Sequence, residues 1–477
     1  MTPAPKVRTN IVLAVLVGLA LRVFFVLKFP VTNSGDAPFY IDLAWNWLKR
    51  GVYGFEVNGR LTPVDMRVPG YPAFLATIFS VTGKSTIAIG IAQAIVDVAT
   101  CFLVAWVASR LAPEASRRRV SLAALWLAVL CPFTANYCAV PLTETLFTFL
   151  TALAILVLVD LPASPAQSAG SIPSPPQRQL SPFFLGAIVV GLGTLVRPEA
   201  PLLLFAAGLV LLFQWWRPAN WPKLLRAGIL MTAGLVLPLL PWAARNWFTL
   251  HDAQFLAPRH SELPGEYVPI GFIDWTNTWL WRLRDVYLVT WKVGSEEIPI
   301  EAIPDSAFDS PAERARVEEL LASYNDVIDV SPGLDAQFRE IARQRTARHP
   351  LRTYLRIPFL RAFTMWFSPR VELLPFGGHL WPIRDEWRDD RRDFLLTLSF
   401  VLLNAIYLAL ALAGAWLARS HPACAFLILF ILIRTLFFAY FVETPEPRYV
   451  LECFPALIAL GAQVFSSRPQ LSSTGSG

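Results

Sequence analysis

The sequence has little charge for its length. Only 16% of its 477 residues are Asp, Glu, Lys or Arg, whereas a soluble chain would carry about a quarter. Hydrophobic residues make up 55%, and the mean hydropathy is +0.48. These values exclude an ordinary soluble enzyme, a disordered chain and a fibrous chain. They are typical of a polytopic membrane protein.

Cysteine and histidine are also scarce. The five cysteines include no C-x-x-C pair, so neither a disulfide framework nor a thiolate metal site is indicated. The five histidines show no H-x-x-x-H spacing, and the chain has no Walker loop and no dinucleotide-binding glycine motif in a strand context. The net charge of +6 does not indicate nucleic-acid binding, because the basic residues lie mostly beside apolar segments.

What the chain does contain is a series of long apolar segments. A helix rises about 1.5 Å per residue and a hydrocarbon core is about 30 Å thick. The sequence therefore predicts an all-α polytopic membrane protein with about ten transmembrane helices, at 10–29, 86–109, 119–137, 140–160, 182–196, 200–216, 225–245, 394–417, 421–441 and 447–466. The first has no cleavage site of small residues, so we expect a retained membrane helix rather than a signal peptide.

Basic residues orient these spans. If the N-terminus is cytoplasmic, alternate ends fall beside Arg110 with Arg117, Arg118 and Arg119, beside Arg178, beside Arg217, Lys223 and Arg226, beside Arg419, and beside Arg468. This distribution agrees with the positive-inside rule. It predicts a multi-pass protein of the plasma (inner) membrane with large loops on the extracytoplasmic face.

We expect three parts along the chain. An N-terminal transmembrane catalytic module, 1–247, includes the first outer loop, 30–85, and a plain cytoplasmic linker, 161–181. An extracytoplasmic loop region with amphipathic and interfacial helices follows at 248–393. Transmembrane helices and a short cytoplasmic tail make up 394–477.

The large outer loop contains its own helix signals. Ser310-Pro311-Ala312-Glu313 is a capping box with Pro at the first helical position. A second helix is predicted to start near Ser331, with Leu334, Phe338 and Ile341 on one face. Residues 350–367 mix arginines with aromatic residues, which is typical of a helix lying in the membrane interface, with an eleventh span as the alternative.

Charges near hydrocarbon are costly, so they point to function or to pairing. In the predicted topology most of them gather at one extracytoplasmic rim: Asp36, Glu144, Arg197, Glu199, Arg245, Glu446 and Arg448. Arginine forks suit phosphate oxygens, and a carboxylate suits a general base. The set therefore predicts a site for an anionic, membrane-embedded substrate.

Structural alternatives exist for several of these residues. Asp36 could cap the helix that follows it, Glu144 could pair with an arginine, and Arg245 could anchor its helix in the interface. Arg197 and Glu199 could neutralise each other.

Two further features lie apart from the rim charges. Asp97 lies near the middle of a span and fits no rim site, and we expect Arg434 to be its partner. The weak candidates for a divalent metal ion are Asp65 and His260.

The collected motifs resemble the integral-membrane glycosyltransferases of the GT-C superfamily. The nearest groups are the dolichyl-phosphate-mannose protein mannosyltransferase-like enzymes and the aminoarabinose lipid A transferase-like enzymes. The resemblance rests on Asp36, Tyr40, Ala44, Leu48, Gly51 and Tyr53, then Arg67-Val68-Pro69-Gly70-Tyr71-Pro72, Pro141-Leu142-Thr143-Glu144, Arg197-Pro198-Glu199, Pro241-Trp242 with Arg245-Asn246, His349-Pro350 with Tyr354-Leu355, and Glu446-Pro447-Arg448-Tyr449.

The resemblance implies a polyprenyl-phosphate-linked sugar donor and a site on the extracytoplasmic face. Asp36 matches the acid that the family uses as base or to orient the acceptor, and Glu144 matches a second acidic position. The candidates for the donor phosphate are Arg67, Arg197, Arg245 and Arg448. The candidates for the substrate are Tyr40, Tyr71, Glu199 and Tyr449.

We therefore predict a hexosyl or pentosyl transferase that acts on a lipid, glycan or protein acceptor. Direct displacement with one acid predicts inversion at the anomeric carbon. No cofactor is required by the pattern, and a divalent metal ion stays an open alternative. A transporter or lipid-handling channel is the second hypothesis, and a ligase or polymerase of whole glycans is the third.

Overall fold

The computed structural model describes residues 5–31, 35–160, 176–260 and 267–466. It divides into two compact units, each of which is described by itself. Unit 1 comprises Met1–Ala257, Pro369–Ile431 and Leu451–Gly477, and unit 2 comprises Pro258–Ser368 and Leu432–Val450. Most of the predicted linker and Arg468 lie outside the described residues. The division of the chain into three parts stays a prediction.

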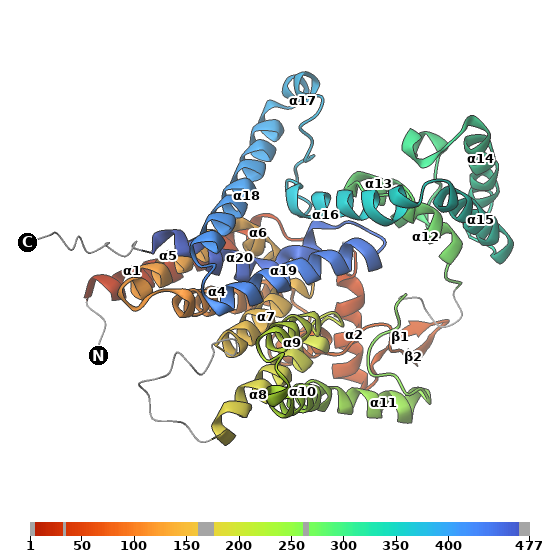
Figure 1. The fold of residues 1–477 in the computed structure, drawn as a ribbon. Coiled ribbons are helices and arrows are strands. Elements are labelled where there is room, and N and C mark those ends of the chain that lie inside the picture. Colours follow the sequence, from red (N-terminus) through yellow and green to blue (C-terminus); the bar gives the residue numbers. More distant parts are fainter. Residues whose placement is uncertain (1–4, 32–34, 161–175, 261–266, 467–477) are drawn as a thin grey trace, which may run out of the picture. The chain divides into compact units, whose positions relative to one another are not determined.

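Unit 1 is built almost entirely from helices (Figure 1). Its elements are α1 (Pro5–Lys28), α2 (Ala37–Arg50), β1 (Gly54–Val57), β2 (Arg60–Pro63), α3 (Gly70–Thr82), α4 (Thr86–Leu111), α5 (Arg117–Val129), α6 (Pro132–Ala135), α7 (Glu144–Leu158), α8 (Pro176–Thr194), α9 (Leu202–Gln214), α10 (Trp221–Val236), α11 (Leu240–Leu250), α17 (Ile383–Asp389), α18 (Arg391–Leu417) and α20 (Phe454–Gly461). α19 (Pro422–Phe441) begins in unit 1 and ends in unit 2.

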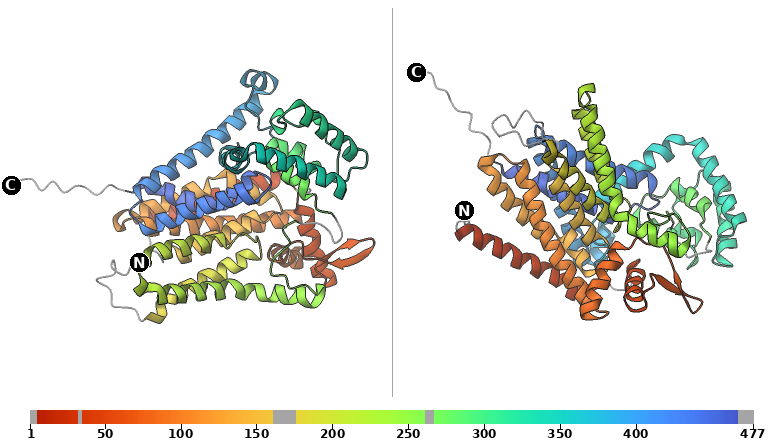
Figure 2. Two further views of the ribbon diagram at one scale, coloured as in Figure 1. Left: turned by 45° about the vertical axis from the view of Figure 1, so that its right-hand side comes forward. Right: turned by 90° about the horizontal axis from the view of Figure 1, so that it is seen from below.

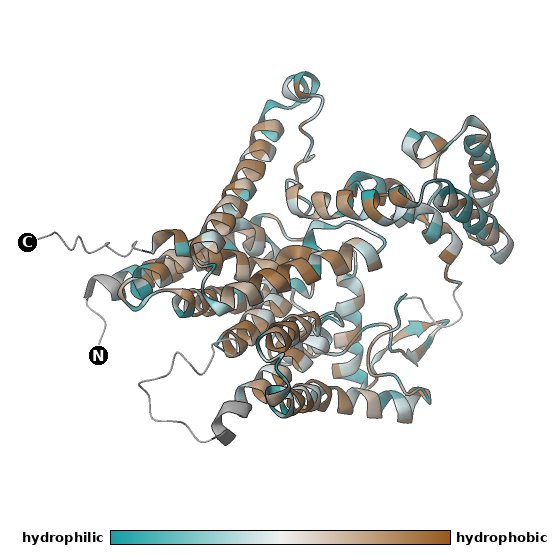
Figure 3. Cartoon of the chain, in the orientation of Figure 1, coloured by the Kyte–Doolittle hydropathy of each residue, from teal (hydrophilic) through white to brown (hydrophobic). Residues whose placement is uncertain are grey.

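Unit 2 contains shorter helices. They are α12 (Ile270–Asn277), α13 (Leu283–Leu288), α14 (Pro311–Asn325), α15 (Pro332–Arg348), a π-helical turn (Arg352–Arg356) and α16 (Ile357–Phe367). Figure 3 shows α18 and α19 mostly brown, whereas α14 and α15 carry more hydrophilic residues.

The chain is a multi-pass membrane protein, but the number of ten spans is not confirmed. In the described part, six helices are long and apolar enough to cross a membrane: Arg8–Lys28, Thr86–Leu111, Pro218–Leu250, Arg391–Leu417, Pro422–Phe441 and Pro447–Phe465. A pair bent by 48°, Glu114–Val129 with Pro132–Ala139, gives a seventh if it counts as one span. All of these coincide with predicted segments.

The remaining three predicted segments contain shorter apolar helices, Glu144–Leu158, Pro182–Thr194 and Leu202–Gln214. A helix of that length reaches only about 20 Å, which is less than a hydrocarbon core. Residues 350–367 are helical too, and they are not among the helices of the described part that are long enough to span.

The expectation of an all-α chain needs one correction. β1 and β2 pair antiparallel, with Gly54 opposite Pro63 and Val57 opposite Arg60. The turn between them is Asn58-Gly59, and both residues have positive φ, at 52° and 75°. An Asn-Gly pair suits this hairpin turn because both residues tolerate the left-handed region. The hairpin lies inside the first predicted outer loop.

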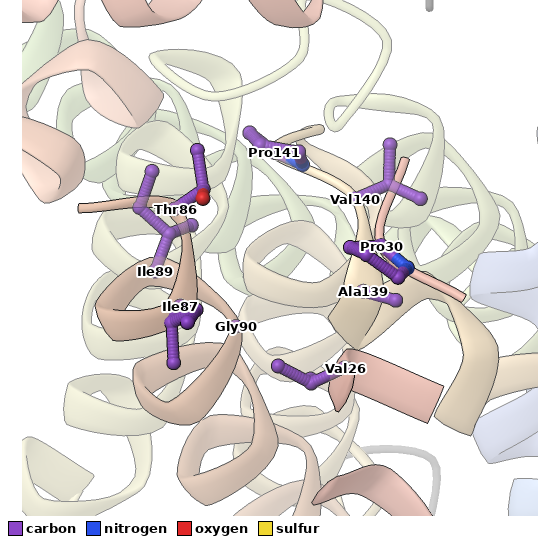
Figure 4. Close-up of a pocket in the computed structure, with 9 residues that line it drawn as sticks. All are labelled: Val26, Pro30, Thr86, Ile87, Ile89, Gly90, Ala139, Val140 and Pro141. Atoms are coloured by element: carbon purple, nitrogen blue, oxygen red, sulfur yellow. The ribbon is translucent and has the colours of Figure 1, made fainter. Parts of the chain in front are cut away.

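In unit 1, α4 packs against α1, α5 and α7, and α8 packs against α10 (Figure 2). α1 and α4 approach closely at Gly90, where a Cβ atom would lie 2.6 Å from a methyl group of Val26. A small cavity of about 20 Å³ opens beside this contact (Figure 4), lined by Val26, Pro30, Thr86, Ile87, Ile89, Gly90, Ala139, Val140 and Pro141. A space of this size holds about one water molecule, so it is not a substrate site.

The prediction that Asp97 pairs with Arg434 is wrong. Arg22 of α1 binds Asp97 of α4, with its Nη2 2.7 Å and its Nε 2.8 Å from Oδ2, and both side chains are buried. Arg22 also donates hydrogen bonds to the carbonyls of Val129 at 2.6 Å and Ala128 at 3.3 Å. The sequence did not reveal this pair because Arg22 and Asp97 lie 75 residues apart and meet only through the packing of α1 on α4.

The helix starts predicted in the outer loop are confirmed. Ser310 accepts a hydrogen bond from the amide of Glu313 at the start of α14, and Ser331 caps α15 by accepting one from Leu334. The apolar faces of the two helices pack with Trp275, Trp279 and other aromatic residues into the core of unit 2. Leu334, Phe338 and Ile341 are all buried there.

Candidate functional site

The first predicted catalytic residue, Asp36, stands directly before α2. Pro38 in the first turn of α2 fits a helix start, because that turn leaves its N–H groups without intrahelical partners. The Asp36 carboxylate does not cap the helix. Instead, Oδ1 accepts a hydrogen bond of 2.7 Å from Nη2 of Arg67, and the Asp36 side chain stays 33% exposed. The carboxylate is therefore both fixed and accessible.

Arg67 reaches Asp36 from the far end of the same loop, and its backbone is held in place. The hydroxyl of Tyr53 donates to the carbonyl of Arg67 at 2.8 Å, with Val68 at 3.3 Å as a second acceptor. Arg245 of α11 in turn donates from Nη2 to the carbonyl of Tyr53 at 2.8 Å and from Nη1 to that of Val64 at 2.9 Å. Two hydrogen bonds thus link α11 to Arg67 through Tyr53, the residue directly before β1.

Gly70 ties this loop to the turn that contains Arg197. The amide of Gly70 donates to the carbonyl of Leu195 at 2.6 Å. A Cβ atom at position 70 would lie 2.4 Å from that oxygen, so no other residue fits without movement of the backbone. This contact explains why the Arg67-Val68-Pro69-Gly70 motif ends in glycine.

Arg197 is surrounded by three carboxylates from separate parts of the chain. Its Nε lies 2.6 Å from Glu199, and its Nη1 lies 3.1 Å from Glu144 and 3.4 Å from Glu452. The guanidinium also faces the ring of Phe147, 5.8 Å from its centroid. All four charged side chains are nearly buried, at 12% exposure or less. The expected pairing of Arg197 with Glu199 is confirmed, and Glu144 shares the same arginine.

Tyr40 is buried in the first turn of α2, four residues after Asp36. Burial raises the pKa of its phenol, and the charges of Asp36 and Glu144 raise it further. The guanidiniums of Arg67 and Arg197 act in the opposite direction. The charges of both groups thus act on one buried hydroxyl.

Tyr71 extends this site toward α4. Its ring packs edge-on against Tyr40 with centroids 5.1 Å apart, and its hydroxyl lies 2.8 Å from Oε1 of Gln93. The amide of Gln93 donates to the carbonyl of Val140 at 2.8 Å and to that of Cys138 at 3.1 Å. Tyr71 is therefore fixed by a buried polar network.

A pocket of about 380 Å³ opens beside the hairpin in unit 1. Aromatic rings and prolines form most of its wall, together with Arg245: Trp47, Gly51, Val52, Tyr53, Pro63, Pro69, Leu195, Pro238, Pro241, Trp242, Arg245 and Thr249. The Arg245 guanidinium lies over the rings of Trp242 and Tyr53, 5.1 Å and 5.4 Å from their centroids. The pocket thus offers stacking faces and one cation.

Two predicted residues belong to a second group in unit 2. Arg448 binds Glu446 with Nε 2.6 Å from Oε2 and Nη2 3.2 Å from Oε1. The Tyr449 hydroxyl lies 2.9 Å from Oε1 of Glu446, and its ring stacks on Phe438 at 4.5 Å. Arg434 donates from Nε to the carbonyl of Tyr449 at 2.7 Å.

The weak metal candidates fall in different units, Asp65 in unit 1 and His260 in unit 2. Partial burial raises the pKa of Asp65, and the nearby charge of Asp252 raises it further. Among the described residues, no group of three or more His, Cys, Asp and Glu side chains has a geometry that could hold a metal ion.

Sequence reasoning missed three members of the site. Glu452 is a fully buried acid in the last predicted span, and the rule that charges in apolar segments are significant would have selected it. Gln93 is likewise a polar residue inside a span. Tyr53 was noticed only as a motif residue, and no local pattern indicates that its hydroxyl reaches Arg67.

The chain was compared with known proteins. No protein-family model and no curated protein matches it. Solved structures of the oligosaccharyltransferase AglB from Archaeoglobus fulgidus have a backbone similar to that of this chain. One structure, in complex with an inhibitory peptide and a dolichol-phosphate, has 14% identity and a TM-score of 0.48. The apo form has 15% identity and a TM-score of 0.48.

The alignment with the AglB structures covers nearly all of this chain but only about half of the AglB chain. It covers 96% of this chain and 49% of the AglB chain in the complex, and 95% and 50% in the apo form. This chain thus spans about half the length of the AglB chain. The similarity concerns the fold and assigns no activity.

Proposed function

We propose that this protein is an integral-membrane glycosyltransferase that moves a sugar from a polyprenyl-phosphate donor to an extracytoplasmic acceptor. The observation that carries the proposal is the fixed yet accessible carboxylate of Asp36, which accepts a hydrogen bond from Arg67. The loop that contains this pair is tied to the turn before Arg197 by the hydrogen bond between Gly70 and Leu195. A base beside fixed guanidiniums is the combination that transfer from a phosphate leaving group requires.

In the proposed reaction, Asp36 accepts the proton of an acceptor hydroxyl. The acceptor oxygen forms a bond to the anomeric carbon while the bond from that carbon to the phosphate oxygen breaks. The phosphate leaves with the electron pair, and Arg67 or Arg197 stabilises its charge. One displacement inverts the anomeric carbon. Glu144 forms an ion pair with Arg197. Its proposed role is therefore to hold that arginine, and not to act as the nucleophile of a double-displacement reaction.

The transporter hypothesis depended on a charge near the middle of a span. Asp97 is that charge, and it is bound to Arg22, which also donates hydrogen bonds to the backbone carbonyls of Val129 and Ala128. A residue held in this way has a structural explanation. The proposal of an enzyme is therefore preferred.

A direct assay tests the class of activity. The purified protein in liposomes would be incubated with a polyprenyl-phosphate-linked sugar and a lipid or peptide acceptor, and products would be identified by mass spectrometry. Cells with and without the protein would be compared for lipid-linked sugars and envelope glycans to identify the natural pair. Solute flux through the liposomes without any glycosyl product would instead favour the transporter.

A further prediction concerns Tyr53, which positions Arg67 without belonging to the reacting groups. Tyr53→Phe removes one hydrogen bond, worth about 1 kcal/mol, so kcat should fall about fivefold. If Tyr53 acts through the Asp36–Arg67 pair, the same substitution should have no further effect in an Asp36→Asn background. Equal losses in both backgrounds would show that Tyr53 supports the fold in general.

A further inference from the structure

Two stripes of exposed apolar residues run along unit 2. From the residue before the π-helical turn to the end of α16 they are spaced by four residues: Leu351, Leu355, Phe359, Phe363 and Phe367, all 50% exposed or more. On the last turns of α19, Leu432, Leu436 and Tyr440 repeat at the same spacing and are 46% exposed or more. Such large exposed apolar surfaces mark contact with a membrane or a partner.

The opposite face of α16 is firmly attached to unit 2. Arg361 is 3% exposed and donates to the carbonyl of Leu280 and to the side chain of Asn277, both at 2.8 Å. Thr364 donates to the carbonyl of Trp281 at 2.7 Å. The outward direction of the apolar stripe is therefore fixed by the fold.

Pro358 shapes the start of this helix. It cannot supply the amide N–H that the carbonyl of Tyr354 would receive in a regular α-helix. The hydroxyl of Tyr440 from α19 donates to that carbonyl at 3.0 Å instead. α19 and the turn before α16 are thereby held side by side, with a space between them.

That space is a groove of about 520 Å³, with walls that are apolar except at Arg356 and Tyr440: Leu351, Leu355, Arg356, Pro358, Phe359, Ala362, Leu436, Ala439 and Tyr440. Arg356 is exposed and makes neither a hydrogen bond nor an ion pair with any residue that the structure describes. A guanidinium at an apolar groove offers its donors to an anion from outside the chain.

We propose that this groove binds an anionic phospholipid of the surrounding bilayer, with an acyl chain between α16 and α19 and the headgroup phosphate on Arg356. The position of the groove relative to the membrane surface supports a phospholipid as the ligand. α19 is itself a candidate span that ends at Phe441, so Leu436, Ala439 and Tyr440 lie in its last turns, near the membrane–water boundary. Headgroup phosphates lie at that level. This site is separate from the proposed reaction and does not depend on it.

Native mass spectrometry of the full-length protein in detergent tests this site. Phosphatidylglycerol and phosphatidylcholine with identical acyl chains would be titrated, and we expect tighter binding of the anionic lipid. Arg356→Gln should weaken phosphatidylglycerol binding about tenfold, as expected for the loss of a charge-assisted hydrogen bond. Arg343→Gln is the matched control, because Arg343 is exposed on α15 and has no described hydrogen bond or ion pair.

A second variant tests the apolar part of the groove. Ala362→Phe should fill the groove and weaken the binding of both lipids. The proposal is overturned if Arg356→Gln behaves like Arg343→Gln, if Ala362→Phe leaves phosphatidylglycerol binding unchanged, or if inorganic phosphate alone displaces the lipid. Tighter binding of polyprenyl phosphate than of phosphatidylglycerol, lost in Arg356→Gln, would assign the groove to the donor instead.

Discussion

Asparagine in place of Asp36 should reduce the rate of sugar transfer by about 10²–10⁴-fold, the usual contribution of a positioned base. The amide keeps the size of the side chain and can still contact Arg67, but it cannot take a proton from the acceptor hydroxyl. The measurement is the initial rate of product formation at saturating donor in liposomes. Binding of the donor should change little.

The control lies on the same helix. Asp42 is half exposed and paired with Lys84, so Asp42→Asn should leave the rate unchanged. Both variants should insert and elute as the unmodified protein does, because the Asp36 side chain does not cap α2. If Asp36→Asn kept full activity, the proposed base would be wrong, whereas an equal loss in both variants would indicate damage to α2.

Alanine in place of Asp97 should lower the stability of the protein by about 3–5 kcal/mol, because it leaves the Arg22 charge buried without its partner. The affected atoms lie in unit 1 between α1 and α4, both of which are candidate spans. The measurement is the temperature at which the purified protein in detergent loses half of its monodisperse fraction. Asp42→Ala is a suitable comparison, because the Asp42 and Lys84 side chains are 53% and 43% exposed, and loss of such a surface pair should cost less than about 1 kcal/mol.

The double variant Arg22→Met with Asp97→Leu separates charge from packing. Replacing a buried ion pair with apolar residues is often close to neutral, so most of the lost stability should return. Recovery should be incomplete, because the carbonyls of Ala128 and Val129 lose the hydrogen bonds that Arg22 donates. Normal glycosyl transfer by the double variant would support a structural role. Loss of a solute flux with stability intact would support a transporter.

The sequence predicted those features that depend on local pattern. Apolar length located all ten segments as helical, and capping residues located the starts of α14 and α15. The number of spans was less predictable, because a helix as short as α7 or α9 can cross a membrane only if its surroundings allow it. The hairpin was not predicted, although Asn58-Gly59 is a strong turn signal. The apolar segments of this chain predict only helices, and the two strands of the hairpin are only four residues long.

The candidate site was predicted in part. The expected cost of charge near hydrocarbon selected Asp36, Glu144, Arg197 and Glu199. In unit 1 the structure brings Glu144 and Glu199 onto Arg197, whereas Asp36 binds Arg67. The identity of each partner was not predictable. Arg67 binds Asp36 across 31 residues, and Glu452 reaches Arg197 across 255. Such pairings are decided by helix packing, which no window of sequence contains.

The contact between Gly70 and Leu195 has a consequence for exchanging segments between related proteins. The amide and carbonyl at this point are so close that the first loop and the turn before Arg197 must be complementary in shape. A graft of the loop alone would meet a turn shaped for another loop and would displace Arg67 relative to Arg197. Residues 35–85 and 195–199 would therefore have to be exchanged together, although more than a hundred residues separate them along the chain. Arg245 would have to be kept with them, because it binds the carbonyls of Tyr53 and Val64 in the same loop.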